Sequence, residues 1–162
     1  MEFCKVDSNK SEELSVFAKS IWLEYFPNII GEETAKYLYN KVQSAVAILE
    51  QFKKGYQYYY MVENGEKVGY FAICVENTEL LLSKFYVKKE HRGKKYGKLA
   101  LEFIQNYAKL NNLKSVYLYV NKNNISSQRV YEKFGFKQKE GIVFDMGNGF
   151  VMDDYKYELK VQ

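Results

Sequence analysis

Apolar residues in the first third of the chain recur at steps of three and four positions, which is the spacing of a helix with one buried face. The stripe consists of Leu14, Phe17, Ile21 and Tyr25. We expect this helix to begin near Asn9 and Glu12, which have the spacing of a helix N-terminal capping pair, and to end near Pro27. A short strand over residues 2–6 precedes it. A second helical region follows over residues 32–54 and is expected to break near Ser44.

From residue 56 the helical spacing gives way to alternation, which is typical of strands. Strands over residues 56–63 and 67–75 are joined by Asn64-Gly65, a strong signal for a two-residue hairpin turn. A third strand over residues 80–87 leads into a cationic segment that contains glycine. The middle of the chain therefore predicts three antiparallel strands.

The second half of the chain predicts two further helices and three further strands. These are a helix over residues 96–111, a strand over 116–120, a helix over 126–134 closed by Gly135, and a hairpin of residues 136–145 and 150–159. The apolar side of the first of these helices is expected to consist of Leu99, Phe103, Tyr107 and Leu110. Because a helix of crossover length joins strands 80–87 and 116–120, these strands should run parallel. The predicted fold class is α/β (α+β), a mixed and mostly antiparallel central sheet with one parallel, splayed strand pair, flanked by helices.

The composition indicates one folded domain. The chain has 162 residues with one Pro and ten Gly, contains no low-complexity segment, and is long enough to bury about 70% of its unfolded surface. We therefore assign residues 1–162 to a single domain. No signal-peptide core and no run of about 18 apolar residues occurs, so we expect a soluble, cytoplasmic protein that does not contact a membrane.

The two cysteines and the single tryptophan are interpreted as structural residues. Cys4 and Cys74 lie in apolar runs and form neither a disulfide framework nor a metal-ligand spacing, so we expect buried free thiols and no metal site. Trp22 is expected in the core or in the wall of a groove, in keeping with an aromatic content of 17%.

Positive charge is concentrated in one segment of the chain. Residues 84–98 contain seven Lys or Arg and one Glu, a net charge of +6, whereas the whole chain carries +4. A cationic loop that leads into a helix binds phosphate well, because the first N–H groups of a helix lack intrahelical partners and the helix dipole is positive there. Because the excess positive charge is confined to one short segment, it favours a compact polyanionic ligand over a nucleic acid. A nucleotide P-loop is excluded because the Gly-Lys-Ser/Thr motif is absent.

Two motifs carry a resemblance to a known family. The first is Arg92-Gly93-Lys94-Lys95-Tyr96-Gly97, and the second consists of Asn124, Ser127, Tyr131 and Gly135-Phe136. With the order of the predicted elements, they resemble the GNAT superfamily of acetyl-CoA-dependent N-acetyltransferases. The resemblance implies the GNAT fold, acetyl-CoA as cosubstrate and no metal. The first motif departs from the family at Lys95, where glycine is common, and a positive φ there would cost a non-glycine residue about 1–2 kcal/mol.

The resemblance also implies where acetyl-CoA binds. The residues concerned are Phe85, Tyr86, Val87, Arg92, Gly93, Lys94, Lys95, Tyr96, Gly97, Lys98, Asn124, Ser127 and Lys133. The amides of the loop would hold the diphosphate, and the edge of strand 80–87 would pair with the pantetheine arm like an added strand.

Proton transfer requires a donor and an acceptor. Tyr131 is what the resemblance implies as the proton donor to the departing thiolate. The acceptor amine must lose a proton, and the family often uses a carboxylate that acts through water. The candidates are Glu24, Asp145, Asp153 and Asp154. The sequence does not decide among them; Glu24 is retained as the catalytic candidate, and His91, the only histidine, is expected to be a bystander.

Two functions remain open at this point. The first is an N-acetyltransferase that moves an acetyl group from acetyl-CoA to a primary amine by direct attack in a ternary complex. The acceptor would be a small-molecule amine, a polyamine, or a peptide or lysine amine. The alternative is a non-catalytic sensor of the same fold that binds acyl-CoA. No nucleic-acid partner is expected, and a homodimer is left open.

Overall fold

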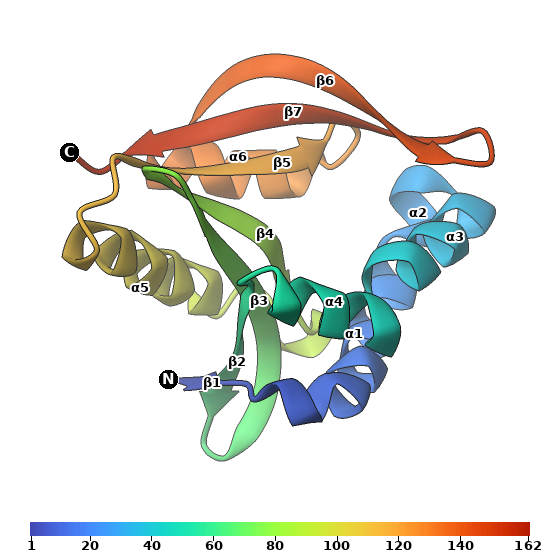
Figure 1. Ribbon diagram of the computed structural model, residues 1–162, viewed down its shortest axis with the longest axis horizontal. Coiled ribbons are helices and arrows are strands. Elements are labelled where there is room, and N and C mark those ends of the chain that lie inside the picture. The colour runs from blue at the N-terminus through green and yellow to red at the C-terminus, as the bar shows by residue number, and fades with distance from the viewer. The chain divides into compact units, whose positions relative to one another are not determined.

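The structure is a computed structural model that describes residues 1–162 (Figure 1). The first half contains β1 (Glu2–Lys5), α1 (Ser11–Tyr25), α2 (Pro27–Ile30), α3 (Glu32–Val42), α4 (Ala45–Lys53), β2 (Gln57–Glu63) and β3 (Glu66–Glu76). The second half contains β4 (Glu79–Val87), α5 (Tyr96–Leu110), β5 (Ser115–Asn121), α6 (Ile125–Phe134), β6 (Lys137–Gly147) and β7 (Phe150–Lys160). Two short 3₁₀ turns cover Ser8–Lys10 and Lys89–His91.

The seven strands form one sheet in the order β1-β2-β3-β4-β5-β7-β6. β4 and β5 pair in parallel, while β1 with β2, β5 with β7, and β6 with β7 pair antiparallel. The predicted fold class, a mixed and mostly antiparallel sheet with one parallel pair and flanking helices, is confirmed.

The chain divides into two compact units. Unit 1 comprises Met1–Ala72 and Lys84–Lys94, and unit 2 comprises Ile73–Ser83 and Lys95–Gln162. Strands β3 and β4 continue from one unit into the other. The boundary also falls inside the cationic segment, between Lys94 and Lys95.

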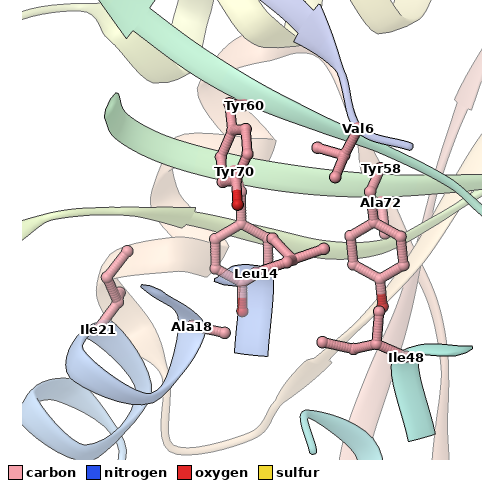
Figure 2. Close-up of a cluster of buried hydrophobic side chains, with 9 residues drawn as sticks. All are labelled: Val6, Leu14, Ala18, Ile21, Ile48, Tyr58, Tyr60, Tyr70 and Ala72. Atoms are coloured by element: carbon pink, nitrogen blue, oxygen red, sulfur yellow. The ribbon is translucent and has the colours of Figure 1, made fainter. Parts of the chain in front are cut away.

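The core of unit 1 lies between α1, α4 and the strands β2 and β3 (Figure 2). The buried side chains shown there are Val6, Leu14, Ala18, Ile21, Ile48, Tyr58, Tyr60, Tyr70 and Ala72. Phe17 packs edge-on against Tyr60, with 5.4 Å between the ring centroids. Leu14, Phe17 and Ile21 of the predicted stripe therefore face this core, whereas Tyr25 packs against Phe26. Trp22 is buried, as expected.

A buried lysine joins four elements of unit 1. The Nζ of Lys84, on β4, donates to the backbone carbonyl of Val42 at the end of α3, to Oε1 of Gln51 on α4 at 2.8 Å, and to the hydroxyl of Tyr58 on β2 at 2.6 Å. Burial lowers the pKa of Lys84 well below its ordinary value. Polar contacts as well as apolar ones thus fix β4 to the helices.

In unit 2, the parallel pairing of β4 and β5 is short. The register runs from Glu79↔Ser115 to Leu81↔Tyr117 and stops there, although β5 continues to Asn121. β7 pairs with the whole of β5, from Ser115↔Lys160 to Asn121↔Asp154. The last four residues of β5 are therefore paired on the β7 side only.

Helix α5 buries a different side from the one predicted. Its buried residues are Ala100, Leu101, Ile104 and Ala108, whereas Leu99 and Leu110 are 41% and 84% exposed. The prediction followed the largest apolar residues at four-residue steps, a spacing that drifts around a helix of 3.6 residues per turn. Two of the four buried residues are alanines, which contribute little to a pattern read from large apolar side chains.

Other local predictions were confirmed or need correction. Asn64 and Gly65 have φ values of 50° and 78°, as a two-residue hairpin turn with both central residues left-handed requires. The helical region breaks at Ser44, which caps α4. Helix α1 begins at Ser11, in the expected region, but the expected capping pair is wrong, because Asn9 lies in the 3₁₀ turn that precedes α1 and its N–H donates to Asp7. The prediction that Cys4 is buried was also wrong: the thiol is free but exposed, since β1 lies at the edge of the sheet.

Candidate functional site

The loop between β4 and α5 presents backbone amides and cations at the start of a long helix. Lys95 precedes α5 with φ 67° and ψ 11°, the left-handed conformation that glycine adopts most easily, and Gly93 has φ 78°. The first hydrogen bond of the α5 ladder runs from the Leu99 N–H to the Lys95 carbonyl at 3.2 Å. The N–H groups of Gly97 and Lys98 precede that bond, no side chain caps the helix, and its first turn contains no acidic residue.

These features suit an anion. Lys94 and Lys95 are exposed, so their charges are available to a ligand. Lys98 is exposed too, and its Nζ lies 3.7 Å from Oε1 of Glu102. A helix N-terminus without a capping side chain retains its partial positive charge and its amide donors. The positive φ expected at Lys95 is found, so this position keeps the backbone of a glycine while adding a cation.

Arg92 and Glu24, predicted for different roles, form an ion pair within unit 1. Nη2 of Arg92 lies 2.9 Å from Oε2 of Glu24, and both side chains are about one third exposed. Nε of Arg92 donates to the Val87 carbonyl at 2.9 Å, and the guanidinium lies 4.8 Å from the centroid of the Tyr25 ring. Arg92 thus ties the start of the loop to the end of α1 and to the end of β4.

The last residues of β4 are held by aromatic packing and by one close backbone approach. The Tyr86 ring lies 5.6 Å from Phe26 and 6.0 Å from Trp22, and Trp22 stacks on Phe26 at 4.0 Å. A Cβ on Gly69 would lie 2.4 Å from the Tyr86 carbonyl oxygen. The sequence prediction missed Gly69, although a glycine inside a strand is a known signal of close approach.

The second motif places its residues at the two ends of α6. The Asn124 side-chain oxygen accepts from the Ser127 N–H at 3.3 Å and caps the helix, and Asn124 is buried. Nε2 of Gln128 donates to the carbonyls of Asn121 and Lys122, both at 3.0 Å, which fixes α6 to the end of β5. No sequence signal identified Gln128. Lys133, in the last turn of the helix, is exposed.

Tyr131 is buried on α6 and is 7% exposed. Its ring packs edge-on against Phe136 at 5.7 Å and lies 6.5 Å from the ring of Tyr157. The Gly135 and Phe136 N–H groups both donate to the Tyr131 carbonyl, at 3.2 and 3.0 Å, which closes the helix. The Gly135-Phe136 pair of the motif therefore orients the tyrosine.

The three candidate carboxylates of the last hairpin have different surroundings. Asp145 is exposed, and its Oδ1 accepts from the Gly147 N–H at 2.9 Å. Asp153 is half-exposed and lies 2.8 Å from Nζ of Lys122. Asp154 is 1% exposed, its Oδ1 has no hydrogen-bond partner, and burial raises its pKa to about 6. The remaining titratable candidate, His91, lies 3.1 Å from Oε1 of the exposed Glu66 in unit 1.

The chain resembles known proteins in sequence and in fold. The model of a family described as the acetyltransferase (GNAT) family matches residues 17–136. Over 63 residues the chain is 38% identical to a probable spermine N(1)-acetyltransferase of Bacillus subtilis subsp. natto and 36% identical to a spermine/spermidine N(1)-acetyltransferase of Bacillus subtilis. Each match covers 38% of this chain and 41% of the relative, so the chain spans about two fifths of the length of these curated relatives.

Solved structures share the fold along nearly the whole chain. The PaiA N-acetyltransferase of Thermoplasma acidophilum in complex with coenzyme A has a TM-score of 0.80 at 22% identity, with 98% of each chain covered. An acetyltransferase of the GNAT family from Staphylococcus aureus has a TM-score of 0.74 at 22% identity, with 99% of each chain covered. None of the helices is long and apolar enough to span a membrane.

Proposed function

Because the chain belongs to the acetyltransferase (GNAT) family, we propose that it transfers an acetyl group from acetyl-CoA to a primary amine by direct attack in a ternary complex. The observation that carries this proposal is the start of α5, where Lys95 adopts a left-handed backbone and uncapped amides lie among exposed lysines. Such a terminus binds a diphosphate through N–H donors, the helix dipole and cations together.

The cofactor residues divide into three groups by their chemistry. Gly93, Gly97 and Lys98 offer backbone amides, and Lys94 and Lys95 offer charge to the diphosphate. The edge of β4 at Phe85, Tyr86 and Val87 would pair with the amide-rich pantetheine arm. The remaining residues proposed for the cofactor are Arg92, Tyr96, Asn124, Ser127 and Lys133. Among them Arg92 acts through the position of the loop, since its guanidinium is already bonded to Glu24 and to the Val87 carbonyl.

Acetyl-CoA supplies an activated thioester, and the residues of this chain manage the protons. Tyr131 is proposed to donate a proton to the departing thiolate. A phenol has a pKa of about 10 and a thiol of about 8.5, so full transfer costs about 2 kcal/mol in water. A dry site raises the pKa of the thiol and narrows that difference. The burial of Tyr131 supports this assignment.

A polyamine is the acceptor that the comparisons favour. Both Bacillus subtilis relatives carry names that refer to spermine acetylation. The last hairpin of this chain contributes three carboxylates, Asp145, Asp153 and Asp154, whose negative charge suits a polycationic substrate. An alkylamine has a pKa of about 10.4, so deprotonating it at pH 7 costs about 4–5 kcal/mol and requires a base.

The decisive experiment combines binding and turnover on the same protein. Calorimetry with coenzyme A is expected to show binding, and release of free thiol from acetyl-CoA is expected with spermine or spermidine. The amine panel also contains a lysine peptide and a monoamine, which test the substrate class. Absence of binding at millimolar coenzyme A would refute the proposal. Binding without turnover on any amine would instead favour the acyl-CoA sensor.

A further inference from the structure

The four carboxylates that could accept the proton of the amine are not equivalent in their contacts. Glu24 is ion-paired with Arg92, and Asp153 is ion-paired with Lys122. Asp145 is exposed and holds the turn of the hairpin through the Gly147 N–H. In each of these three carboxylates one oxygen is already engaged by a cationic or structural partner. One candidate differs from the others in this respect.

Asp154 is nearly fully buried and keeps an oxygen without a protein partner. It is 1% exposed, and its Oδ1 accepts no hydrogen bond. Buried polar atoms normally have a partner, and an unsatisfied one in a folded protein calls for an explanation such as a catalytic role. Oδ1 is therefore an atom of this hairpin that retains the capacity to accept a hydrogen bond from a water.

Asp154 lies beside the C-terminal end of β5 in the sheet of unit 2. It lies on β7 directly opposite Asn121, the last residue of β5, and opposite Ile142 of β6. This is four residues beyond Tyr117, where the pairing of β4 with β5 ends. The same end of β5 receives two hydrogen bonds from Gln128 of α6, the helix that carries Tyr131. The helix that carries the proposed proton donor and the residue Asp154 are therefore both held at the same end of β5.

We infer that Asp154 is the general base that accepts the proton of the acceptor ammonium, and this inference rests on the proposed acetyltransferase function. Because Oδ1 is inaccessible to direct contact with a bulky amine, the proton reaches it through one intervening water. The ammonium N–H bond breaks and an O–H bond forms on Asp154. The amine nitrogen then forms a bond to the acetyl carbon and loses a second proton to solvent, the carbon–sulfur bond breaks, and the thiolate takes a proton from Tyr131. Solvent restores both side chains, so one proton is released for each acetyl group transferred.

The charges around Asp154 fit a base that works near neutral pH. Burial is the main cause of its raised pKa of about 6, the neighbouring Asp153 raises it further, and Lys122 lowers it. Its register neighbours, Asn121 and Ile142, carry no charge. Lys156 is the next charged residue along β7. A base with such a pKa is ionised at pH 7.5, and catalysis is most efficient when the pKa of the base lies close to the working pH.

The test is Asp154→Asn, which keeps the size of the side chain and removes the base. We expect kcat with spermine at pH 7.5 to fall at least about 10²-fold, the range for general acid–base catalysis, while calorimetry finds coenzyme A affinity unchanged. In the wild type, activity should fall as the pH decreases through about 6, because protonated Asp154 cannot act as a base. The variant should lack this acid limb and should recover towards wild-type rates near pH 10, where the amine is deprotonated in water.

Two further variants separate a base from a structural residue. Glu140→Gln is the matched control: it makes the same change from a carboxylate to an amide on the same hairpin, at an exposed side chain of β6 that takes no part in the proposed site, so kcat should not change. Asp153→Asn should move the acid limb to lower pH, because it removes the negative charge that raises the pKa of Asp154. A general loss of hairpin structure would not move the limb in this way.

The outcomes distinguish this inference from the function on which it rests. Wild-type turnover in Asp154→Asn would refute the base and leave the acetyltransferase standing. A wild type that binds coenzyme A yet acetylates no amine would refute both. Should Asp154→Asn fail to fold, carbon NMR of the aspartate carboxyls in the wild type decides: one aspartate titrating near pH 6 supports the inference, and none above pH 5 overturns it.

Discussion

Gly69→Ala tests the close approach of β3 to the end of β4, the strand proposed to bind the pantetheine arm. The added Cβ would lie 2.4 Å from the Tyr86 carbonyl oxygen, 3.1 Å from the Val87 Cα and 3.2 Å from the Met61 sulfur. Ordinary contacts of a Cβ begin at 3.4 Å, so β4 would have to move by about 1 Å. Two of the three atoms belong to the backbone and cannot turn aside, unlike the tip of a flexible side chain.

The expected effect is a loss of stability together with weaker cofactor binding. Overpacking of this kind costs about 1–3 kcal/mol, against a gain of about 0.4–1 kcal/mol from the lower entropy of alanine in the unfolded chain. Urea unfolding should therefore show a lower midpoint, and calorimetry should show weaker binding of coenzyme A because the end of β4 is displaced.

Gly141→Ala is the matched control for this experiment. Gly141 also lies in a strand, and its added Cβ would meet the flexible end of Lys122, at 3.3 Å from Nζ and 3.4 Å from Cε, and the Asp154 carbonyl oxygen at an ordinary contact distance of 3.9 Å. We expect its stability to equal or slightly exceed that of the wild type. Equal unfolding midpoints for Gly69→Ala and Gly141→Ala would refute the argument from close approach.

Three further predictions concern single groups. Lys84→Met should lower the free energy of unfolding by about 1–3 kcal/mol, because buried acceptors lose their donor. In the wild type, stability should rise as the pH increases towards 10.5, because the unfolded chain holds the Lys84 proton more tightly than the folded one. Lys84→Met should abolish this rise, and a variant with the pH profile of the wild type would contradict the reasoning. A double-mutant cycle of Glu24→Gln and Arg92→Lys should give a coupling free energy of about 0.2–1 kcal/mol in urea unfolding, since the pair is partly exposed. The coupling should be smaller in high salt, and additive effects of the two substitutions would exclude a stabilising pair. Tyr131→Phe should lower turnover about 10²-fold with little change in coenzyme A affinity, and wild-type turnover would remove its role as proton donor.

Local structure was largely predictable because its signals are local. The Asn64-Gly65 turn, the break at Ser44 and the parallel pair of β4 and β5 follow from residue types and from the lengths of connecting segments. The positive φ at Lys95 could be anticipated from the motif. The buried side of α5 and the exposure of Cys4 could not, because both depend on which neighbours the element meets: a side with buried alanines in one case and an edge of the sheet in the other.

By itself, the sequence determined the order of the elements, the fold class, the family and the cationic loop before α5, since each depends on periodicity or on residues a few positions apart. Only the tertiary structure distinguished the four carboxylates. Glu24 meets Arg92 across 68 positions of the chain, whereas Asp154 is buried with an unpartnered oxygen one residue from the ion-paired Asp153. Burial and pairing set the basicity of a carboxyl group, and both depend on neighbours that are remote in sequence.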